Sequence, residues 1–430
     1  MLSAFAQAFR TPDLRRKLFF TLMIMALFRL GSFIPTPGVD SKAVQMCIAN
    51  QNEASLLDLV NLFSGGALLQ LSVFALGIMP YITASIIIQL LRVVIPRFDD
   101  LHKEGQTGQA KLTQYTRYLT IFLGILQSTT YIALARSGQM FSGCTHKVIG
   151  DDSIPMILLM ILVMTAGTGV IMWLGELVTE RGIGNGMSLL IFTSIAARLP
   201  SQLLSIGQAG KWGSVAAIVG LMLAVTLVVV YLEQAQRRIP VQYAKRMVGR
   251  RQYGGTTTYI PLKLNMSGVI PVIFATSILA LPPLVAQFGD PTQAWVQWIS
   301  ANFSQTAWPY LVGYGLLTLF FTFFYTAITF NPDEVADNMK RYGGFIPGYR
   351  AGRPTAEYLT YVINRITTAG ALYLVVIALL PTLAMIPLNL SANQMPFGGT
   401  TLLIVVGVGL QTVKEINTQL QQHHYEGFLR

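Results

Sequence analysis

The sequence predicts an all-α membrane protein with ten transmembrane helices, arranged as two inverted halves of five helices, and one further short half-helix. Three observations support this fold class. Hydrophobic residues make up 53% of the 430 residues and charged residues 11%, whereas about a quarter of the residues in a soluble domain are charged. Apolar runs of membrane-spanning length recur along the chain, and one long apolar stretch is interrupted by helix-breaking residues.

The apolar runs define the ten predicted helices, since a hydrocarbon core takes about 20 apolar residues in a helix. The first run follows Arg15, Arg16 and Lys17, as in a secretory signal, but no small-residue cleavage pattern follows it. We therefore expect it to be retained as the first span. The ten runs cover residues 18–34, 73–95, 117–135, 154–175, 186–199, 213–232, 267–288, 308–330, 366–387 and 399–413.

The apolar stretch over residues 61–91 is too irregular for one plain helix. It begins with Ser-Gly-Gly at 64–66 and is interrupted again at Gly77 and Pro80. The sequence predicts a half-helix over about residues 62–71, followed by a full span. Irregular backbone at membrane depth persists only where it is buried in protein or lines a water-filled cavity, because lipid offers its polar groups no partners. This segment therefore indicates a cavity or pore.

Basic residues predict the orientation in the membrane. An even number of spans places both termini on one side, and the four basic residues between positions 10 and 17 place that side in the cytoplasm. The predicted outer loops at 289–307 and 388–398 contain no lysine or arginine. Topology therefore accounts for much of the net charge of +11.

The ten spans divide into an N-terminal half, residues 1–205 with helices one to five, and a C-terminal half, residues 206–430 with helices six to ten. Because five is an odd number, the two halves would have opposite orientations. Inverted repeats commonly place a working pathway at the interface between the halves. No internal sequence match is visible, so this division rests on the helix count.

Two long cytoplasmic loops belong to the C-terminal half. The loop at 234–264 has seven basic residues and no acidic ones, and its segment 256–260 favours extended structure. The loop at 331–365 mixes both signs of charge, and its glycines and prolines predict a structured hairpin. Loops of this length are usually functional or disordered.

The two cysteines, Cys47 and Cys144, both fall in predicted outer loops. A disulfide requires Cα atoms within about 7 Å. Sequence positions alone do not establish that proximity, so the sequence leaves both the paired and the unpaired states open.

Groups expected of an enzyme or an ion-coupled carrier are scarce in the predicted spans, where each ionisable side chain costs roughly 2.5–3.5 kcal/mol. All ten aspartates lie in loops or the N-terminal tail, and Glu176, Glu180 and Glu233 lie at predicted helix ends. Ser188 resembles the serine of a membrane protease, but no buried histidine is available as its base. Arg29 is the one awkwardly placed charge, and we expect its side chain to snorkel toward the interface.

Seven stretches of the sequence, in the same order along the chain, closely resemble signature stretches of the SecY family, the channel-forming subunits of bacterial protein translocases. The resemblance covers nearly the whole chain. It implies an hourglass of ten helices with a lateral gate that opens to lipid, no cofactor and no enzymatic activity. The stretches are RLGSFIPTPGVD from Arg29, FSGGALLQLSVFALGIMPYITASIIIQLL from Phe63, GELVTERGIGNGMSLLIF from Gly175, RRIPVQYAKR from Arg237, PLKLNMSGVIPVIFA from Pro261, FYTAITFNPDEVADNMK from Phe324 and GGTTLLIVV from Gly398.

The resemblance implies a central ring of aliphatic side chains that constricts the pore. A narrow apolar constriction dewets and blocks ions, while soft side chains can part around an extended polypeptide. Met187 departs from the usual branched aliphatic residue, and its flexible thioether fits irregular contours. The matching positions are Ile78, Ile82, Met187, Ile191, Ile273 and Ile404.

The resemblance assigns the predicted half-helix to the family's plug, which closes the outer funnel at rest. A fixed re-entrant loop is the alternative. The plug residues are Phe63, Ser64, Gly65, Gly66, Ala67, Leu68 and Leu69.

Spans two and seven resemble the lateral-gate helices. We expect polar residues near their seam, where hydrogen bonds between spans, worth about 0.6 kcal/mol on average, would suit reversible opening. These residues are Thr83, Gln127, Thr276 and Ser277.

The basic loop resembles the family's docking site for the ribosome and the SecA motor, although topology alone also explains its charges. Contact with ribosomal RNA would run through phosphates and depend steeply on salt. The matching residues are Lys245, Arg246, Arg250, Arg251 and Arg350.

The resemblance thus implies a passive protein-conducting channel of the general secretory pathway in the bacterial plasma (inner) membrane. It would translocate unfolded preproteins through the pore and insert membrane proteins through the gate. Implied partners are SecE, SecG, SecA, the ribosome with its RNA, preprotein substrates and membrane lipids, but not DNA.

An ion-coupled secondary transporter is the second hypothesis, because it shares inverted repeats and broken helices. Such a transporter would need polar side chains that coordinate its ion at the midplane of the membrane. An intramembrane protease is the third and lacks its catalytic groups.

Overall fold

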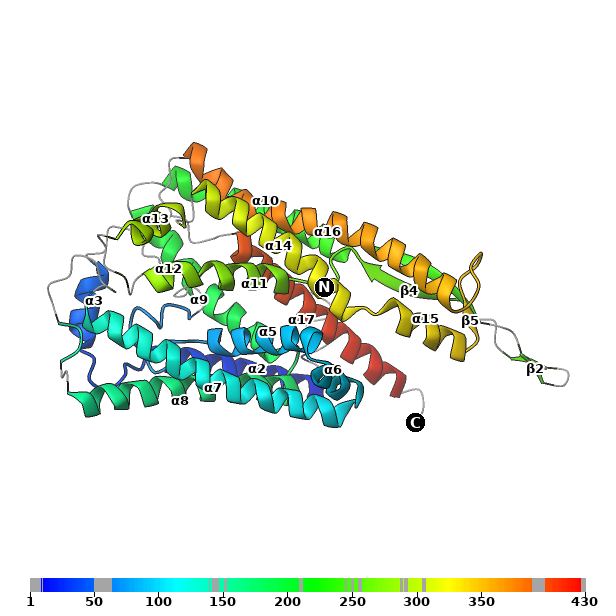
Figure 1. Cartoon of the computed structure of the whole chain (residues 1–430), viewed down its shortest axis with the longest axis horizontal. Helices are drawn as coiled ribbons and strands as arrows, with labels where there is room; N and C mark the ends of the chain where they lie inside the picture. Colours follow the sequence, from blue (N-terminus) through cyan, green and yellow to red (C-terminus); the bar gives the residue numbers. More distant parts are fainter. Residues whose placement is uncertain are drawn as a thin grey trace.

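Helix covers most of each of the ten predicted apolar runs in the computed structural model (Figure 1). The seventh run is divided between two helices, α11 and α12. The structure describes residues 9, 11–49, 64–138, 140, 147–150, 153–208, 212–243, 246–248, 251–253, 257–286, 289, 293–303, 307–388 and 399–426. The helices are α2 (Pro12–Gly31), α5 (Met79–Val94), α7 (Gln106–Arg136), α8 (Ile154–Arg181), α9 (Gly186–Gln208), α10 (Trp212–Gln234), α11 (Ile270–Leu279), α12 (Leu281–Ala286), α14 (Trp308–Thr329), α16 (Arg353–Leu388) and α17 (Gly399–Glu426).

Several of these helices extend well beyond their apolar runs. Helix α7 begins at Gln106 and α16 at Arg353, whereas the predicted runs begin at 117 and 366. An apolar run marks only the part of a helix that needs a hydrocarbon environment. The backbone hydrogen bonds continue through the adjoining polar turns, where the side chains face water.

The second span is the most irregular of the ten. Residues 73–78 form turns, with Gly77 at φ +57°, and α5 begins only at Met79. Pro80 lies in the first turn of α5, where its missing N–H leaves no helical bond unmade. The helix ends before Pro96, whose ring disfavours helical backbone in the preceding residue, and α6 (Pro96–Lys103) turns away by 101°. The sequence analysis predicted the first interruption but not this second one.

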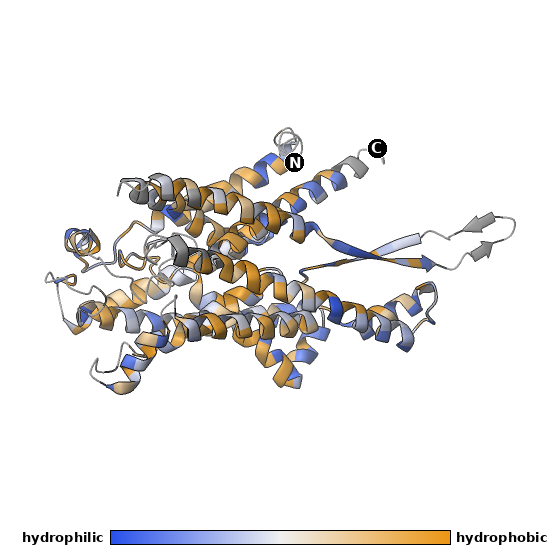
Figure 2. Ribbon diagram, turned by 90° about the horizontal axis from the view of Figure 1, so that it is seen from above, coloured by the Kyte–Doolittle hydropathy of each residue, from blue (hydrophilic) through white to orange (hydrophobic). Residues whose placement is uncertain are grey.

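Length and apolarity support a multi-pass membrane protein. Within the described residues, four helical segments qualify as membrane spans, and the bent pair α5–α6 is a fifth. Figure 2 shows hydrophobic residues along the middle of the helices and polar residues toward their ends. The ten-helix arrangement is consistent with the predicted ten spans. The four segments are Gln106–Arg136, Ile154–Arg181, Trp308–Arg341 and Arg353–Leu380.

The two long loops meet in one small sheet at the end of the molecule that we call the hairpin end. Strand β1 (Gln236–Tyr243) pairs antiparallel with β4 (Thr257–Lys263) on one side and with β5 (Gly344–Phe345) on the other. Strands β2 (Arg246–Val248) and β3 (Arg251–Tyr253) pair at the tip, which projects from the helices in Figure 1. The predicted extended segment is therefore confirmed over β4.

The loop at 331–365 does not form the predicted hairpin. It begins with helix α15 (Pro332–Arg341), and only β5 is a strand. The side chain of Asn331 accepts hydrogen bonds from the backbone N–H groups of Asp333 and Glu334 and so caps the helix. An asparagine cap followed by proline and two acidic residues is a strong helix-start signal, which outweighs the glycines farther along.

The three largest apolar clusters among the described residues join many of the helices. One joins α7 and α8 with helix α3 (Ser41–Ala49), in the N-terminal half. A second joins α10, α11, α14, α16 and α17, in the C-terminal half. The third, which we call the central cluster, combines α2, α8 and α9 with Ile273 of α11 and Ile404 of α17. The central cluster therefore connects the two predicted halves.

The end opposite the hairpin carries α3 and the short helix α13 (Ala294–Asn302) (Figure 1). Cys47 in α3 is buried and disulfide-bonded. The sequence contains one other cysteine, Cys144, which lies outside the described residues.

Candidate functional site

The six side chains predicted to form a ring all belong to the central cluster. Four are buried members, and two, Ile82 and Met187, are half-buried and pack against it. They come from α5 and the turn before it, from α9, from α11 and from α17, so both halves contribute. The six are Ile78, Ile82, Met187, Ile191, Ile273 and Ile404.

A cavity of about 450 Å³ ends at four of these side chains, Ile82, Met187, Ile191 and Ile273. A second cavity of about 720 Å³ adjoins it and reaches Lys263 at the base of the hairpin. The path from the hairpin end therefore leads to the ring. Four residues line both cavities: Asn185, Ser188, Ile270 and Tyr325.

Helix α9 orders the site along its length. Met187, Ile191, Ser194 and Arg198 follow one another at helical spacings of four, three and four residues and so share one face. The first two belong to the ring. The next two approach the predicted plug, because a Cβ atom on Gly65 would lie 3.2 Å from Ser194 Cα. The plug segment is thus farther along α9 than the ring, on the side away from the cavities.

The described part of the plug, residues 64–71, consists of consecutive turns where the sequence analysis predicted a half-helix. The backbone N–H of Leu68 donates to Ser64 Oγ over 3.2 Å, and the N–H of Leu71 donates to the carbonyl of Leu68 over 3.0 Å. The glycines at 65 and 66 have φ of +69° and +91°, which is left-handed backbone and prevents regular helix from forming there. Phe63 lies outside the described residues.

The plug is nonetheless tightly packed. Ser64, Ala67, Leu68 and Leu69 are all buried. Leu68 belongs to the apolar cluster of α3, α7 and α8. A segment with this burial and few backbone bonds of its own depends on its neighbours for its position.

Apolar side chains close the seam between α5 and α11, the predicted gate helices. Ile86 of α5 and Phe274 of α11 are buried in one cluster with Phe321 of α14. The rings of Phe274 and Phe321 meet edge to face with centroids 5.6 Å apart, an arrangement that aromatic pairs favour.

The hydroxyl groups of the predicted polar gate residues do not donate hydrogen bonds from one gate helix to the other. Thr83 donates to the carbonyl of Met79, while Thr276 and Ser277 both donate to the carbonyl of Ile273, each within its own helix. Gln127 is half-buried on α7, which packs against α5, α6 and α8. In this structure the three hydroxyls therefore donate within their own helices, and apolar side chains fill the seam. The gate role of the four residues stays a prediction.

Comparison with known proteins identifies the family. A family model of SecY matches residues 72–413. The protein translocase subunit SecY of Streptomyces scabiei is 61% identical over 438 residues, and that of Mycobacterium bovis is 55% identical over 441 residues; each match covers 100% of both chains. The chain belongs to the SecY family. It is accordingly a protein-conducting channel and not an enzyme.

Solved structures share the fold of this SecY-family chain. One, described as the structure of a protein conducting channel, is 19% identical with a TM-score of 0.63. Another, Sec61 in the canine ribosome-channel complex from the endoplasmic reticulum, is 18% identical with a TM-score of 0.60. Each match covers 94% of this chain and 91% of the other.

Three of the five residues predicted to dock partners are described in the structure of this SecY-family chain. Arg246 and Arg251 begin the paired strands β2 and β3 at the tip, while Lys245 and Arg250 lie outside the described residues. Arg350 is exposed between β5 and α16, and its carbonyl accepts a hydrogen bond from Thr355. Since β5 pairs with β1, the segment that carries Arg350 is joined to the base of the hairpin whose tip carries Arg246 and Arg251.

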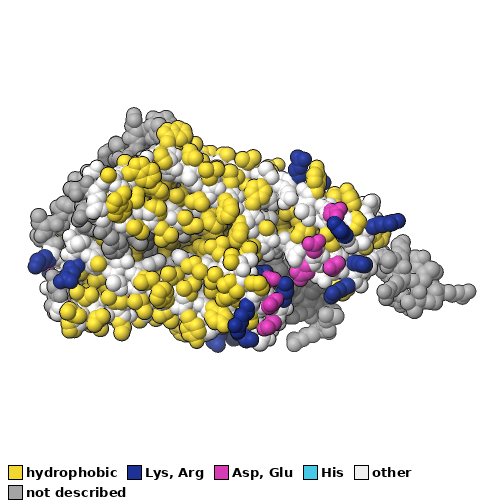
Figure 3. Space-filling view, viewed as in Figure 1, with side chains coloured by type: hydrophobic (Ala, Val, Ile, Leu, Met, Phe, Trp, Pro, Cys, Tyr) yellow, Lys and Arg dark blue, Asp and Glu magenta, His cyan; other side chains and the backbone are white. Residues whose placement is uncertain are grey.

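Figure 3 shows where charge gathers on one face of the molecule. Charged side chains of both signs concentrate toward the hairpin end, while hydrophobic side chains cover the middle. Such an apolar band between polar ends is the pattern expected of a protein surrounded by lipid.

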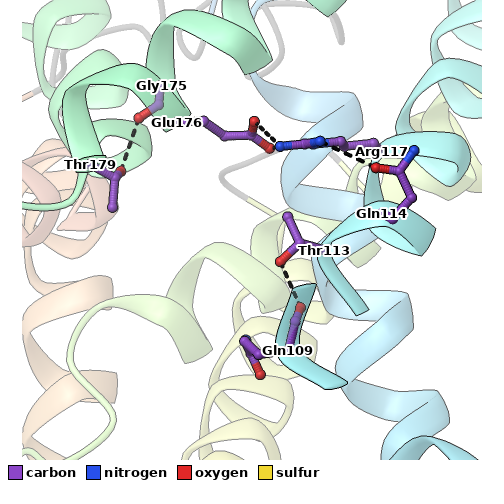
Figure 4. A network of polar contacts seen from close by, with 7 residues as sticks. All are labelled: Gln109, Thr113, Gln114, Arg117, Gly175, Glu176 and Thr179. Atoms are coloured by element: carbon purple, nitrogen blue, oxygen red, sulfur yellow. Dashed lines mark hydrogen bonds and ion pairs between the residues drawn. The ribbon is translucent and has the colours of Figure 1, made fainter. Parts of the chain in front are cut away.

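An ion pair between Arg117 and Glu176 lies in the wall of the 450 Å³ cavity and was not predicted from the sequence. Arg117 of α7 donates from Nε and Nη2 to the two carboxylate oxygens of Glu176 on α8, over 2.9 and 2.6 Å (Figure 4). Gln114 accepts a further bond from Arg117 Nη1. The two partners are 59 residues apart in sequence, so no local pattern pairs them. This bidentate ion pair links α7 to α8 beside the cavity. It also neutralises two charges that would be unfavourable without a partner in a partly buried position.

Arg29 has a specific partner, whereas the sequence led us to expect that its side chain only snorkels toward the interface. Its Nη1 donates to the carbonyl of Gly65 in the plug over 2.8 Å. Its guanidinium also lies 4.6 Å from the centre of the Phe33 ring. A lone arginine within an apolar span was the available signal, because such residues usually have a specific partner.

Within the part of the chain that the structure describes, no group of three histidine, cysteine or acidic residues is placed to hold a metal ion. The features of the candidate site are therefore its two cavities, the apolar side chains where they end and a few paired charges.

Proposed function

We propose that this chain conducts unfolded preproteins through the central cluster and releases hydrophobic segments into lipid between α5 and α11. In this proposal residues 1–205 and 206–430 are the two halves whose separation opens both routes. The single observation that carries it is the convergence of six aliphatic side chains, from both halves, in one cluster. Four of them line a cavity that adjoins the cavity at the hairpin base.

The proposed ring works without a specific ligand. Aliphatic side chains exclude water from a narrow passage and so oppose ion flow. They also offer no hydrogen bonds that would select one peptide sequence over another. Generic apolar contacts therefore suit a substrate that is an extended chain of variable sequence.

The proposed plug adds a second barrier beyond the ring. Ser64 to Leu69 are packed between α9 and the N-terminal apolar cluster, with little helical bonding of their own. Such a segment can leave its seat without unfolding a regular element.

The energy source and the partners belong to the proposal as well. The sequence has no motif of a nucleotide site, so we expect SecA with ATP or a translating ribosome to drive transport from the hairpin surface. SecE and SecG would join the chain in the bacterial plasma membrane, with both termini and the hairpin in the cytoplasm. The seven basic residues of the loop at 234–264, which has no acidic ones, support this orientation.

A reconstitution experiment tests the function directly. The chain, with SecE and SecG, is placed in liposomes, SecA and ATP are added outside, and protection of an exported precursor from protease is measured. The proposal predicts protection that requires ATP and a signal sequence. Absence of protection, with active SecA and correctly folded protein, would contradict it. Solute uptake driven by an ion gradient without SecA would instead favour the secondary transporter.

A further inference from the structure

Two arginines from different helices converge on two consecutive glycines of the plug. Arg29, in the last turn of α2, donates to the carbonyl of Gly65 over 2.8 Å. Arg198 of α9 has its Nε 3.5 Å from the position that a Cβ atom on Gly66 would occupy. The plug backbone therefore packs against a surface that contains two guanidinium groups, those of Arg29 and Arg198; we call this surface the seat.

The local geometry leaves little room for a side chain at position 65. A Cβ on Gly65 would lie 3.2 Å from Arg29 Nη1 and 3.2 Å from Ser194 Cα, which is tighter than ordinary van der Waals contact. The glycine at this position also has φ of +69°, a conformation that other residues rarely adopt. Glycine thus allows the carbonyl to reach the guanidinium.

The other end of the plug is anchored differently. The carbonyl of Leu71 accepts two hydrogen bonds from Thr36, from the backbone N–H over 3.0 Å and from Oγ1 over 2.6 Å. Leu71 itself has φ of +45°, which is unusual for a leucine. The backbone N–H of Val73 donates to the carbonyl of Ile34 over 2.9 Å. Backbone pairing therefore anchors the end near Leu71, whereas a side chain holds the end near Gly65.

The geometry points to Arg29 as a positioning residue that keeps the plug closed. Its hydrogen bond to Gly65 is charge-assisted, a class stronger than neutral bonds. It holds the end of the plug near Gly65, opposite the end that is anchored at Leu71, so its loss loosens that end while the anchored end stays in place. This inference rests on the proposed plug role, which the experiment below tests separately.

The test measures ion conductance of the purified channel complex in planar bilayers without SecA or substrate. Arg29→Gln removes the charge, and Arg29→Lys keeps a positive donor with a different shape. We expect Arg29→Gln to raise the resting open probability about tenfold, the effect of losing one charge-assisted bond. Arg29→Lys should recover part of the closure.

Arg365→Gln is the matched control. Arg365 also lies beside an aromatic ring, that of Tyr361 at 5.3 Å, but on α16 and away from the plug. Its substitution should leave the resting conductance unchanged. An equal rise in both variants would show a general effect of arginine loss and overturn the inference.

A plug deletion separates the inference from the function on which it rests. Deleting residues 65–69 should itself open the channel, and Arg29→Gln should then add nothing, because the two changes remove the same interaction. A silent deletion would refute the plug role. An effective deletion with a silent Arg29→Gln, or with additive effects of the two changes, would refute the assignment of Arg29 alone.

Discussion

An apolar constriction closes by excluding water, so its seal depends on each side chain that lines it. Ile82 and Met187 are the half-buried members of the ring, and both line the cavity. Their exposure marks the boundary between the wet cavity and the dry cluster. A polar side chain at this boundary would form hydrogen bonds with water and so allow water to enter the central cluster from the cavity.

The first prediction concerns this boundary. Replacing Ile82 and Ile191 together by asparagine should raise the ion leak of the resting channel in planar bilayers by about tenfold or more, because two hydrated amides lower the barrier to water. Replacing both by valine keeps the surface apolar and serves as the control. Unchanged conductance in the asparagine variant would count against the ring.

The residues of the ring could be named in advance only through the family resemblance. Ile78 and Ile404 are 326 positions apart, and an isoleucine in an apolar helix carries no sign of its neighbour across the fold. Arg29 and Arg117 were visible as charges, but their partners Gly65 and Glu176 were not. Such pairings depend on how the helices pack.

At the scale of the element, the seam between α5 and α11 is held by packing. The buried contacts of Ile86, Phe274 and Phe321 fill it, while the nearby hydroxyls bond within their own helices. A seam of this kind separates at the cost of lost packing, and a hydrophobic segment entering from the pore can replace that packing with its own.

The second prediction tests the seam. Ile86→Ala removes buried methyl groups and should make opening easier by about 1 kcal/mol, or about fivefold. We expect stronger transport of a precursor with a weakened signal sequence, while an intact precursor changes little. Leu223→Ala, on the exposed face of α10, is the control. Equal transport of the weakened precursor by wild type and Ile86→Ala would exclude this account of the gate.

The third prediction concerns the docking surface. Arg350→Glu should lower SecA-dependent transport more than about tenfold, because like charges placed together at an interface cost several kcal/mol. Arg250→Glu should chiefly weaken ribosome cosedimentation and make it less dependent on salt. Both variants are measured in both assays. If each variant impaired both assays equally, the two segments would form one undivided site.

Elements were largely predictable, and their boundaries were not. Ten apolar runs became helices because apolarity sustained over a membrane thickness leaves few other structures possible. The bend before Pro96, the early starts of α7 and α16 and the helix α15 were missed. In each case a local signal of capping, proline or polar helix former lay outside the apolar run.

At the scale of the whole molecule, each predicted half has an apolar cluster of its own. The halves share the central cluster, the seam cluster of Ile86, Phe274 and Phe321, and a small cluster of Leu14, Ile183 and Ile416. Opening the path therefore means separating shared clusters while the cluster within each half stays intact. The turns of the plug and the cavities at the hairpin end lie on opposite sides of the central cluster. In the proposed function, this arrangement makes the central cluster both the barrier for ions and the passage for polypeptide.

One measurement tests this claim most directly. Photo-crosslinking amino acids are placed at Ile82, at Ile191 and, as a control on the exposed face of α10, at Leu223. The channel is reconstituted with SecE, SecG and SecA, and an exported precursor is stalled during transport with ATP. We expect crosslinks to the precursor at Ile82 and Ile191, dependent on ATP and a signal sequence, and none at Leu223. Transport without crosslinks at either ring position would show that the polypeptide takes another path.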